Sequence, residues 1–107
     1  MELAEKKCVP CEGGVEPFSK SQAEAYLAQV AGWILSPDAR SISHQFKFKD
    51  FADCLVFVNR VGQIAEAEGH HPDTLFGWGY AAITLTTHAI HGLSENDFIL
   101  AAKINRL

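Results

Sequence analysis

The sequence contains no apolar run of the length, about twenty residues, that a membrane-spanning helix needs, so we expect no membrane span. Its N-terminal stretch MELAEKKCVPCEGG also lacks the apolar segment of a secretory signal. Cysteine is scarce, and its odd count of three argues against a disulfide framework and favours a reducing compartment. These absences together predict a cytoplasmic protein.

Positive charge is also in short supply. Nine Lys and Arg residues face thirteen Asp and Glu residues, which gives a formal net charge of −4. Proteins that bind nucleic acid typically cluster Lys and Arg on one surface, so we expect no nucleic-acid partner. Neither G-x-G-x-x-G nor a Walker loop is present, so no motif indicates a nucleotide cofactor, and none is expected.

What the chain does contain is enough apolar side chain for one core. It has 107 residues, 48% of them hydrophobic, which suits a single domain. Residues 1–18 carry Cys, Pro and Gly without any period, so we expect an arm or loop there. The folded domain is expected over residues 19–107.

Three helices are predicted from their capping signals and apolar spacing. The first is expected over residues 20–31, and the long central one from residue 51 to near Glu68, with Gly69 just beyond its end. The third is expected shortly before the C-terminus. The predicted N-cap residues are Ser19, Asp50 and Ser94.

Two hairpins are predicted between these helices. SISHQFKFK alternates apolar and polar residues, which indicates a strand with one wet face in a hairpin over residues 33–49. The stretches 74–79 and 80–88 indicate a second strand pair, with His88 on the more polar face. The order α-β-β-α-β-β-α predicts a single α+β domain whose antiparallel sheet is covered on one face.

The stretch EAEGHHP, residues 66–72, is the first candidate for chemistry. Imidazole titrates near pH ~6.5, so a histidine can transfer protons near neutral pH. Glu66 and His70 are spaced i, i+4, which favours Glu66 as the group that orients His70. Pro72 biases His71 toward an extended backbone, so we expect the two histidines at a defined corner.

Three interpretations of these histidines stay open. The first is an acid–base site, to which His88 would contribute. The second is a zinc site, although the familiar H-E-x-x-H spacing is absent. The third is a solvated loop with a local capping role. The ligands of the zinc alternative would be Glu66, His70, His71 and His88.

The remaining histidines and cysteines carry weaker signals. His44 and His91 have no supporting pattern and are interpreted as structural or surface residues. Cys8 and Cys11 form a single C-x-x-C, whereas a structural zinc site normally needs a second pair. We therefore expect an exposed cysteine pair in a mobile arm.

One ordered set of residues is more specific than any single motif. Its members are separated by three, five, nine and eight residues: Glu66, His70-His71-Pro72, Trp78, His88 and Asp97. This spacing resembles the signature of the pterin-4a-carbinolamine dehydratases, and QFKFKDF, ITLTTH and GLSENDF also resemble that family. The resemblance covers the chain from about Gly32 onward. It implies a four-stranded antiparallel sheet with helices on one face, in agreement with the predicted element order.

The resemblance implies a lyase that acts on a pterin. Members of the family remove water from 4a-hydroxytetrahydropterin and release quinonoid dihydropterin, in the recycling of tetrahydrobiopterin after aromatic amino acid hydroxylation. Such a 4a-hydroxytetrahydrobiopterin dehydratase needs an acid for the leaving hydroxyl and a base for the N5 proton, both of which suit histidine. It needs no cofactor and no metal.

The resemblance also implies roles for individual residues. His70 and His88 would be the acid–base residues, His71 would bind and orient the pterin, and Glu66 would support His70. The implied substrate-binding residues are Gly69, His70, His71, Pro72, Thr86, Thr87, His88, Ala89 and Trp33.

Two residues have a structural alternative. Trp33 is expected either as an aromatic wall on which the flat pterin stacks or as a core residue. Asp97 is expected to cap the last helix rather than to take part in catalysis.

A homodimer or homotetramer is implied by the family, and an aromatic amino acid hydroxylase is a possible partner. The alternative function is a non-catalytic, protein-binding role, such as the transcriptional cofactor role of some animal relatives. A pterin- or molybdopterin-handling protein is a related alternative.

Overall fold

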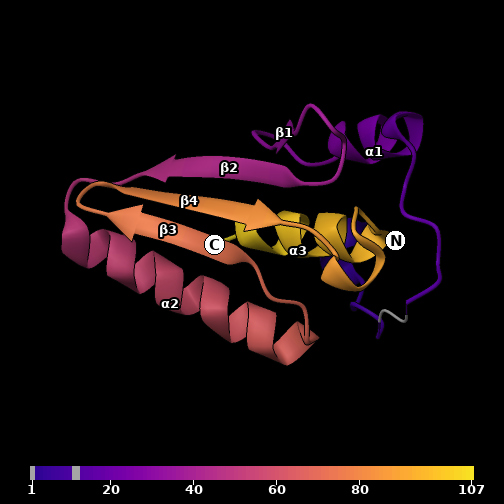
Figure 1. Cartoon of the computed structure of the whole chain (residues 1–107). Helices are drawn as coiled ribbons and strands as arrows, with labels where there is room; N and C mark the ends of the chain where they lie inside the picture. Colours follow the sequence, from indigo (N-terminus) through magenta and orange to yellow (C-terminus); the bar gives the residue numbers. More distant parts are fainter. Residues whose placement is uncertain (1, 11–12) are drawn as a thin grey trace.

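The computed structural model describes residues 2–10 and 13–107. In that part the helices are α1 (Lys20–Leu27), α2 (Phe51–Glu68) and α3 (Glu95–Asn105), with short 3-10 helices η1 (Leu3–Glu5) and η2 (His88–Ile90). The strands are β1 (Ile34–Leu35), β2 (Ile42–Lys47), β3 (Asp73–Gly77) and β4 (Tyr80–Leu85). Figure 1 shows this α+β arrangement, which confirms the predicted fold class and element order.

The helices begin where the capping residues predict. The side chain of Asp50 accepts from the backbone N–H of Asp53, and both Ser19 and Ser94 form capping boxes. α1 ends at Leu27, four residues before the predicted end. After it, the Val30 N–H bonds to the Leu27 carbonyl, so the chain tightens into turns that carry Val30 into the core.

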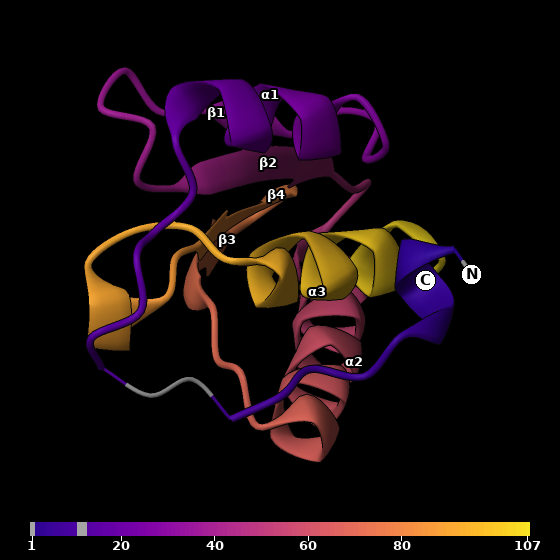
Figure 2. The ribbon, with the colours of Figure 1, turned by 90° about the vertical axis from the view of Figure 1, so that its right-hand side faces the viewer.

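The four strands form one antiparallel sheet in the order β1-β2-β4-β3. Ile42 pairs with Leu85 and Phe46 with Ala81, so apolar residues of β2 and β4 line up on one face. α2 and α3 cover that face, and α1 packs against β1 and α3 (Figure 2). The opposite face carries polar side chains of β2, namely Ser43, Gln45 and Lys47.

The prediction that His88 belongs to a strand is wrong. β4 ends at Leu85 because its partner strand β2 begins at Ile42, directly opposite, so the following backbone groups have no ladder partner there. The chain instead forms η2, in which the His91 N–H donates to the His88 carbonyl. A bridge between Thr87 and Gly92 closes this loop and places His88 at its exposed tip.

The N-terminal arm lies against α3 in the part that the structure describes. Leu3 is buried, Lys103 donates to the Ala4 carbonyl over 2.8 Å, and Lys6 forms a 2.9 Å ion pair with Glu95. Since Lys103 and Glu95 stand at opposite ends of α3, the arm runs antiparallel to that helix. The boundary between arm and domain at residue 18 stays a prediction.

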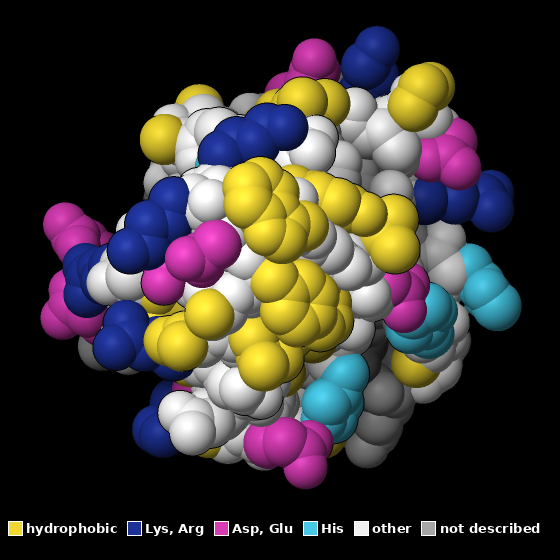
Figure 3. Space-filling model, turned by 90° about the vertical axis from the view of Figure 1, so that its left-hand side faces the viewer, with side chains coloured by type: hydrophobic (Ala, Val, Ile, Leu, Met, Phe, Trp, Pro, Cys, Tyr) yellow, Lys and Arg dark blue, Asp and Glu magenta, His cyan; other side chains and the backbone are white. Residues whose placement is uncertain are grey.

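One end of the molecule carries exposed apolar side chains. They gather where the β3–β4 turn meets the start of α2 (Figure 3). The Phe51 and Phe76 rings stack there with centroids 5.7 Å apart, and Trp78 is 73% exposed. Leu55 and Leu75 are exposed as well. In the described part of the chain, no helix is both long and apolar enough to span a bilayer.

Candidate active site

His70 is turned into the molecule at the end of α2. Gly69 adopts the left-handed conformation, with φ of 67°, and ends the helix as predicted. The next residue, His70, is only 9% exposed. Its Nε2 lies 2.6 Å from Oδ1 of Asp97 and donates to it. The ring is therefore held in one orientation by a buried carboxylate.

Asp97 serves two functions at the start of α3. Its Oδ2 accepts hydrogen bonds from the Thr87 hydroxyl at 2.8 Å and from the Ser94 N–H at 3.0 Å, while Oδ1 binds His70. The position suits an anion because it lies at a helix N-terminus. The predicted cap is confirmed, and the contact with His70 is the part that sequence reasoning missed. The only signal for it was the spacing of Asp97 from the histidines.

Glu66 contacts His71 rather than His70. A hydrogen bond joins Glu66 Oε2 and His71 Nε2, and both side chains are mostly exposed. The i, i+4 argument for a Glu66–His70 pair is wrong, because the left-handed Gly69 breaks the helical period before His70 is reached. The two adjacent histidines therefore point to different carboxylates, one buried and one in solvent.

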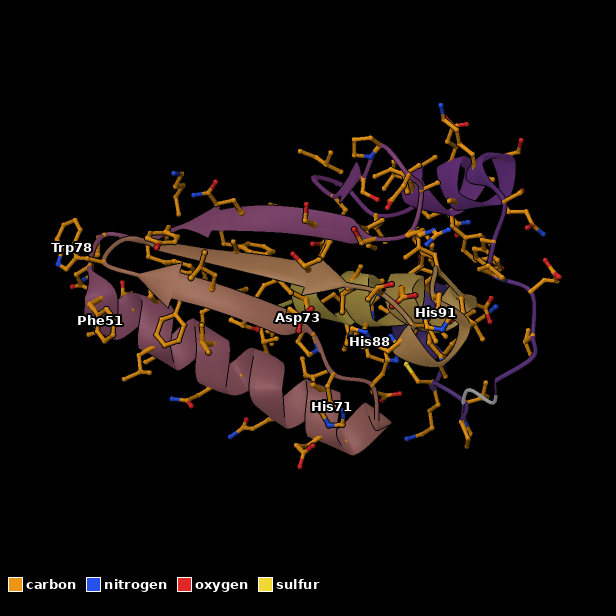
Figure 4. All side chains as sticks on the ribbon, in the orientation of Figure 1. Phe51, His71, Asp73, Trp78, His88 and His91 are labelled. Carbon is orange, nitrogen blue, oxygen red and sulfur yellow. The ribbon has the colours of Figure 1, made fainter. Side chains whose placement is uncertain are left out.

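His70 and His71 border a pocket of about 220 Å³. The lining comes from the arm, the end of α2, the loop after β4 and the start of α3: Val9, Gly69, His70, His71, Thr86, Thr87, His88, Ala89 and Asn96. Figure 4 shows His71 near the end of α2 and His88 beyond the end of β4. A larger hollow of about 830 Å³ lies along α2, but no histidine lines it.

Most of the predicted site residues meet in this pocket, and three do not. Gly69, Thr86 and Ala89 line it beside the three histidines, as does Thr87. Glu66 contacts the lining residue His71, and Pro72 follows it in the sequence, but neither is part of the pocket wall.

Trp33 is the third exception, and its prediction as a pocket wall is wrong. It is 5% exposed, its indole N–H donates to Asn105 Oδ1 over 2.9 Å, and its ring packs edge-on against His44 and Phe46. This places it in the core, at the opposite end of α3 from the pocket. The sequence could not distinguish a pocket wall from a core position for Trp33, because an aromatic residue beside a short apolar run is typical of both.

The candidate metal ligands do not gather. Among the residues that the structure describes, no three His, Cys, Asp or Glu side chains form a group that could hold a metal ion. Glu66, His70, His71 and His88 therefore do not form the zinc cluster that was left open.

Cys8 is not the exposed residue that the sequence predicted. It is partly buried, its N–H donates to Glu68 Oε1 over 2.8 Å, and its thiol donates weakly to the Asn96 carbonyl. Burial, with a smaller contribution from the Glu68 carboxylate, raises the pKa of the Cys8 thiol to about 12. Cys11, its partner in the C-x-x-C motif, lies outside the described residues.

The fold and the site define a small α+β domain with a histidine-lined pocket. The model of the family "Pterin 4 alpha carbinolamine dehydratase" matches residues 16–107. A protein of Halorhodospira halophila is 58% identical over the whole chain and 98% of its own length, and one of Aromatoleum aromaticum is 50% identical over 99% and 95%. Both carry provisional names as pterin-4-alpha-carbinolamine dehydratases. The chain therefore belongs to the pterin-4a-carbinolamine dehydratase family of hydro-lyases.

Solved structures agree with this assignment. The crystal structure of a transcriptional coactivator/pterin dehydratase from Brucella melitensis superposes with a TM-score of 0.80 at 30% identity, covering 85% of this chain and 97% of that one. A pterin dehydratase-like protein described as a RuBisCO assembly factor of the alpha-carboxysome gives 0.61 at 25% identity, over 70% and 87%.

Proposed function

We propose that this protein dehydrates 4a-hydroxytetrahydropterin to quinonoid dihydropterin by histidine acid–base catalysis. The observation that carries the proposal is the meeting of His70, His71 and His88, from two separate stretches of chain, around one pocket. Family membership supplies the substrate class. We place the reaction in the recycling of tetrahydropterin cofactors after aromatic hydroxylation, in the cytoplasm.

The dehydration requires two proton transfers. The C4a hydroxyl leaves as water once it accepts a proton, and the N5–H proton passes to a base as the N5–C4a double bond forms. The overall change is the loss of one water molecule, with no change in oxidation state. Positioned acid–base groups typically accelerate such steps by ~10²–10⁴-fold.

His70 and His88 are the proposed acid–base pair. His70 suits a fixed role because Asp97 orients its ring inside the wall of the pocket. His88 lies on the exposed η2 and reaches the pocket from another side. Two such groups around one ligand would serve both stereoisomers at C4a.

The other lining residues are proposed to bind the pterin. His71, held by Glu66, would orient the ring from the solvent side. Gly69, Thr86 and Ala89 would offer backbone groups to the polar edge of the pterin. Thr87 acts differently, because its hydroxyl is already donated to Asp97.

The test is a stopped-flow assay with freshly generated 4a-hydroxytetrahydrobiopterin. The variants are His70→Gln and His88→Gln. Glutamine at position 70 retains a donor for the buried Asp97, so the carboxylate is not left unpaired, but it cannot exchange a proton near neutral pH. Each variant is expected to lose ~10²-fold or more in kcat.

The control is His91→Asn. His91 is exposed, lies outside the pocket and has a positive φ of 55°, a conformation that asparagine tolerates. This variant is expected to retain wild-type rates. A folded wild type that gives no acceleration would contradict the proposed function and would leave a protein-binding role, as in the coactivator alternative.

We also propose that the protein forms a homo-oligomer. β3 stands at the edge of the sheet, and the exposed apolar side chains beside it continue onto α2. An edge strand next to such a patch can be covered by a second copy.

A further inference from the structure

We infer that the N-terminal arm supplies a wall of the pterin pocket, with Val9 as a binding residue and Asn96 as the residue that positions it. The inference rests on the proposed function, since it assigns a further part of the same site. It goes beyond the histidine signature, which begins more than fifty residues later in the chain.

The arm is fastened at the edge of the pocket by a paired hydrogen bond. The Val9 N–H donates to Oδ1 of Asn96 over 3.0 Å, and Nδ2 of Asn96 donates to the Val9 carbonyl over 2.7 Å. Asn96 is 4% exposed, so water competes little for these bonds. The side chain of Asn96 thus imitates a strand partner and fixes the backbone of Val9.

Neighbouring contacts keep this segment in place. The N–H of Cys8 is held by Glu68, whose other oxygen lies 3.8 Å from the ammonium of Lys103. Asn96 precedes Asp97, the partner of His70, so the same turn of α3 positions both the arm and the buried histidine. The arm passes the end of α2 at this point (Figure 2).

Val9 is one of the few apolar side chains in the pocket lining. Among the lining residues that the structure describes, Val9 and Ala89 are the two with hydrocarbon side chains, and the rest are histidines, threonines, an asparagine and a glycine. A flat pterin ring needs polar partners at its edge and apolar contact on its face. Val9 is 67% exposed, so a pterin bound in the pocket can cover its apolar side chain.

Holding Val9 in advance also favours binding. A loop that is ordered only when ligand arrives must lose conformational freedom at that moment, whereas a segment fixed by Asn96 has already lost it. The arm would therefore lower the KM rather than raise the rate of the proton transfers. This distinguishes its role from that of the histidines.

The experiment compares Val9→Ala with Val15→Ala in the full-length protein. Val15 is another exposed valine of the arm, at 59%, and it does not line the pocket. Val9→Ala is expected to raise the KM for 4a-hydroxytetrahydrobiopterin by about 3–10-fold with kcat nearly unchanged, as expected for the loss of two buried carbons. Val15→Ala is expected to leave both constants at the wild-type values.

Asn96→Ala provides the second comparison of the test. It should raise the KM to a similar degree. The KM of the double variant Val9→Ala/Asn96→Ala should not exceed the larger of the two single-variant KM values, because both substitutions act through one contact. Thermal unfolding of each variant shows whether α3 still forms. Equal KM values for the Val9→Ala and Val15→Ala proteins would overturn the inference.

Titration with 7,8-dihydrobiopterin separates this inference from the proposed function. Weaker dihydropterin binding by Val9→Ala, but not by Val15→Ala, supports Val9 as part of the pocket wall. This holds even if the wild type fails to accelerate dehydration, a result that would contradict only the proposed activity. Unchanged binding by Val9→Ala together with an active wild type removes the inference and leaves the activity standing. A wild type that binds no dihydropterin contradicts both.

Discussion

At the scale of single residues, the site depends on which carboxylate each histidine meets. His70 lies against a buried aspartate that is also bound by Thr87 and Ser94, whereas His71 meets an exposed glutamate. A buried and fully bonded Asp97 holds its partner with little freedom. The same two-residue motif therefore yields one buried ring inside the wall and one exposed ring at the surface.

Cys8 gives a prediction about pH at this scale. Its pKa is raised to about 12, mainly by burial, from an ordinary value near 9.0. The stability contributed by the neutral thiol is therefore fully present below pH about 9 and is lost as the pH rises toward about 12, because the unfolded chain releases its proton first. Urea unfolding at pH 8 and pH 10.5 should show a larger loss of stability for the wild type than for Cys8→Ala.

The same pKa makes Cys8 a poor nucleophile in the folded protein. Iodoacetamide at pH 8 should label it slowly under native conditions and quickly in urea, as peptide mass spectrometry would show. Rapid native labelling of Cys8 would contradict both the burial and the fastening of the arm.

At the scale of elements, the end of α2 decides where the histidines point. Gly69 takes a left-handed conformation that ends the helix and turns His70 inward, and the chain then enters β3 through Pro72. η2 has the same effect at the end of β4, where it turns His88 toward the pocket. Two chain reversals, rather than two regular elements, thus assemble the site.

Two glycines of this region make a matched pair. A Cβ added to Gly69 or to Gly62 meets no atom within 4 Å, but only Gly69 has a positive φ. Gly69→Ala should therefore cost about 1 kcal/mol of stability through backbone strain. Gly62→Ala, in the interior of α2, should add about 0.5–1 kcal/mol.

Denaturant unfolding measures both changes, and the dehydration assay shows whether the strained variant misplaces His70. Gly69→Ala is expected to lower kcat as well as stability, since the histidine follows directly. Equal stabilisation by the two alanines would show that the left-handed turn is not needed.

At the scale of the whole molecule, the open end of the sheet is the feature left without a partner. Its exposed apolar side chains surround the β3–β4 turn (Figure 3), and β3 pairs with β4 on one side only within the described chain. A homo-oligomer would cover both. The pocket lies at the other end of β4, so loss of assembly is expected to spare it.

The oligomer is tested with Trp78→Ser and Leu75→Ser. Analytical ultracentrifugation should show a larger species for the wild type and a monomer, or weaker association, for the double variant. Lys47→Ser, on the polar part of the same sheet face, is the control and should assemble as the wild type does. A monomeric wild type at micromolar concentrations would contradict the proposal.

Local patterns in the sequence determined the element order, the helix caps and the histidine corner. These features depend on residues within a few positions of one another: Asp50 and Asp53, Ser94 and Asp97, or Gly69 beside His70. Short-range hydrogen bonds and apolar spacing are visible in a sequence, which is why these predictions were confirmed.

Only the tertiary structure decided which partners meet across the chain. The pairing of His70 with Asp97, the burial of Trp33 against Asn105 and the docking of Val9 on Asn96 join residues that are 27, 72 and 87 positions apart. No local propensity encodes such contacts, because they depend on how α3 packs between the sheet, α2 and the arm. The sequence therefore determined which residues are candidates for chemistry, and the packing of α3 determined which of them lie together around the pocket.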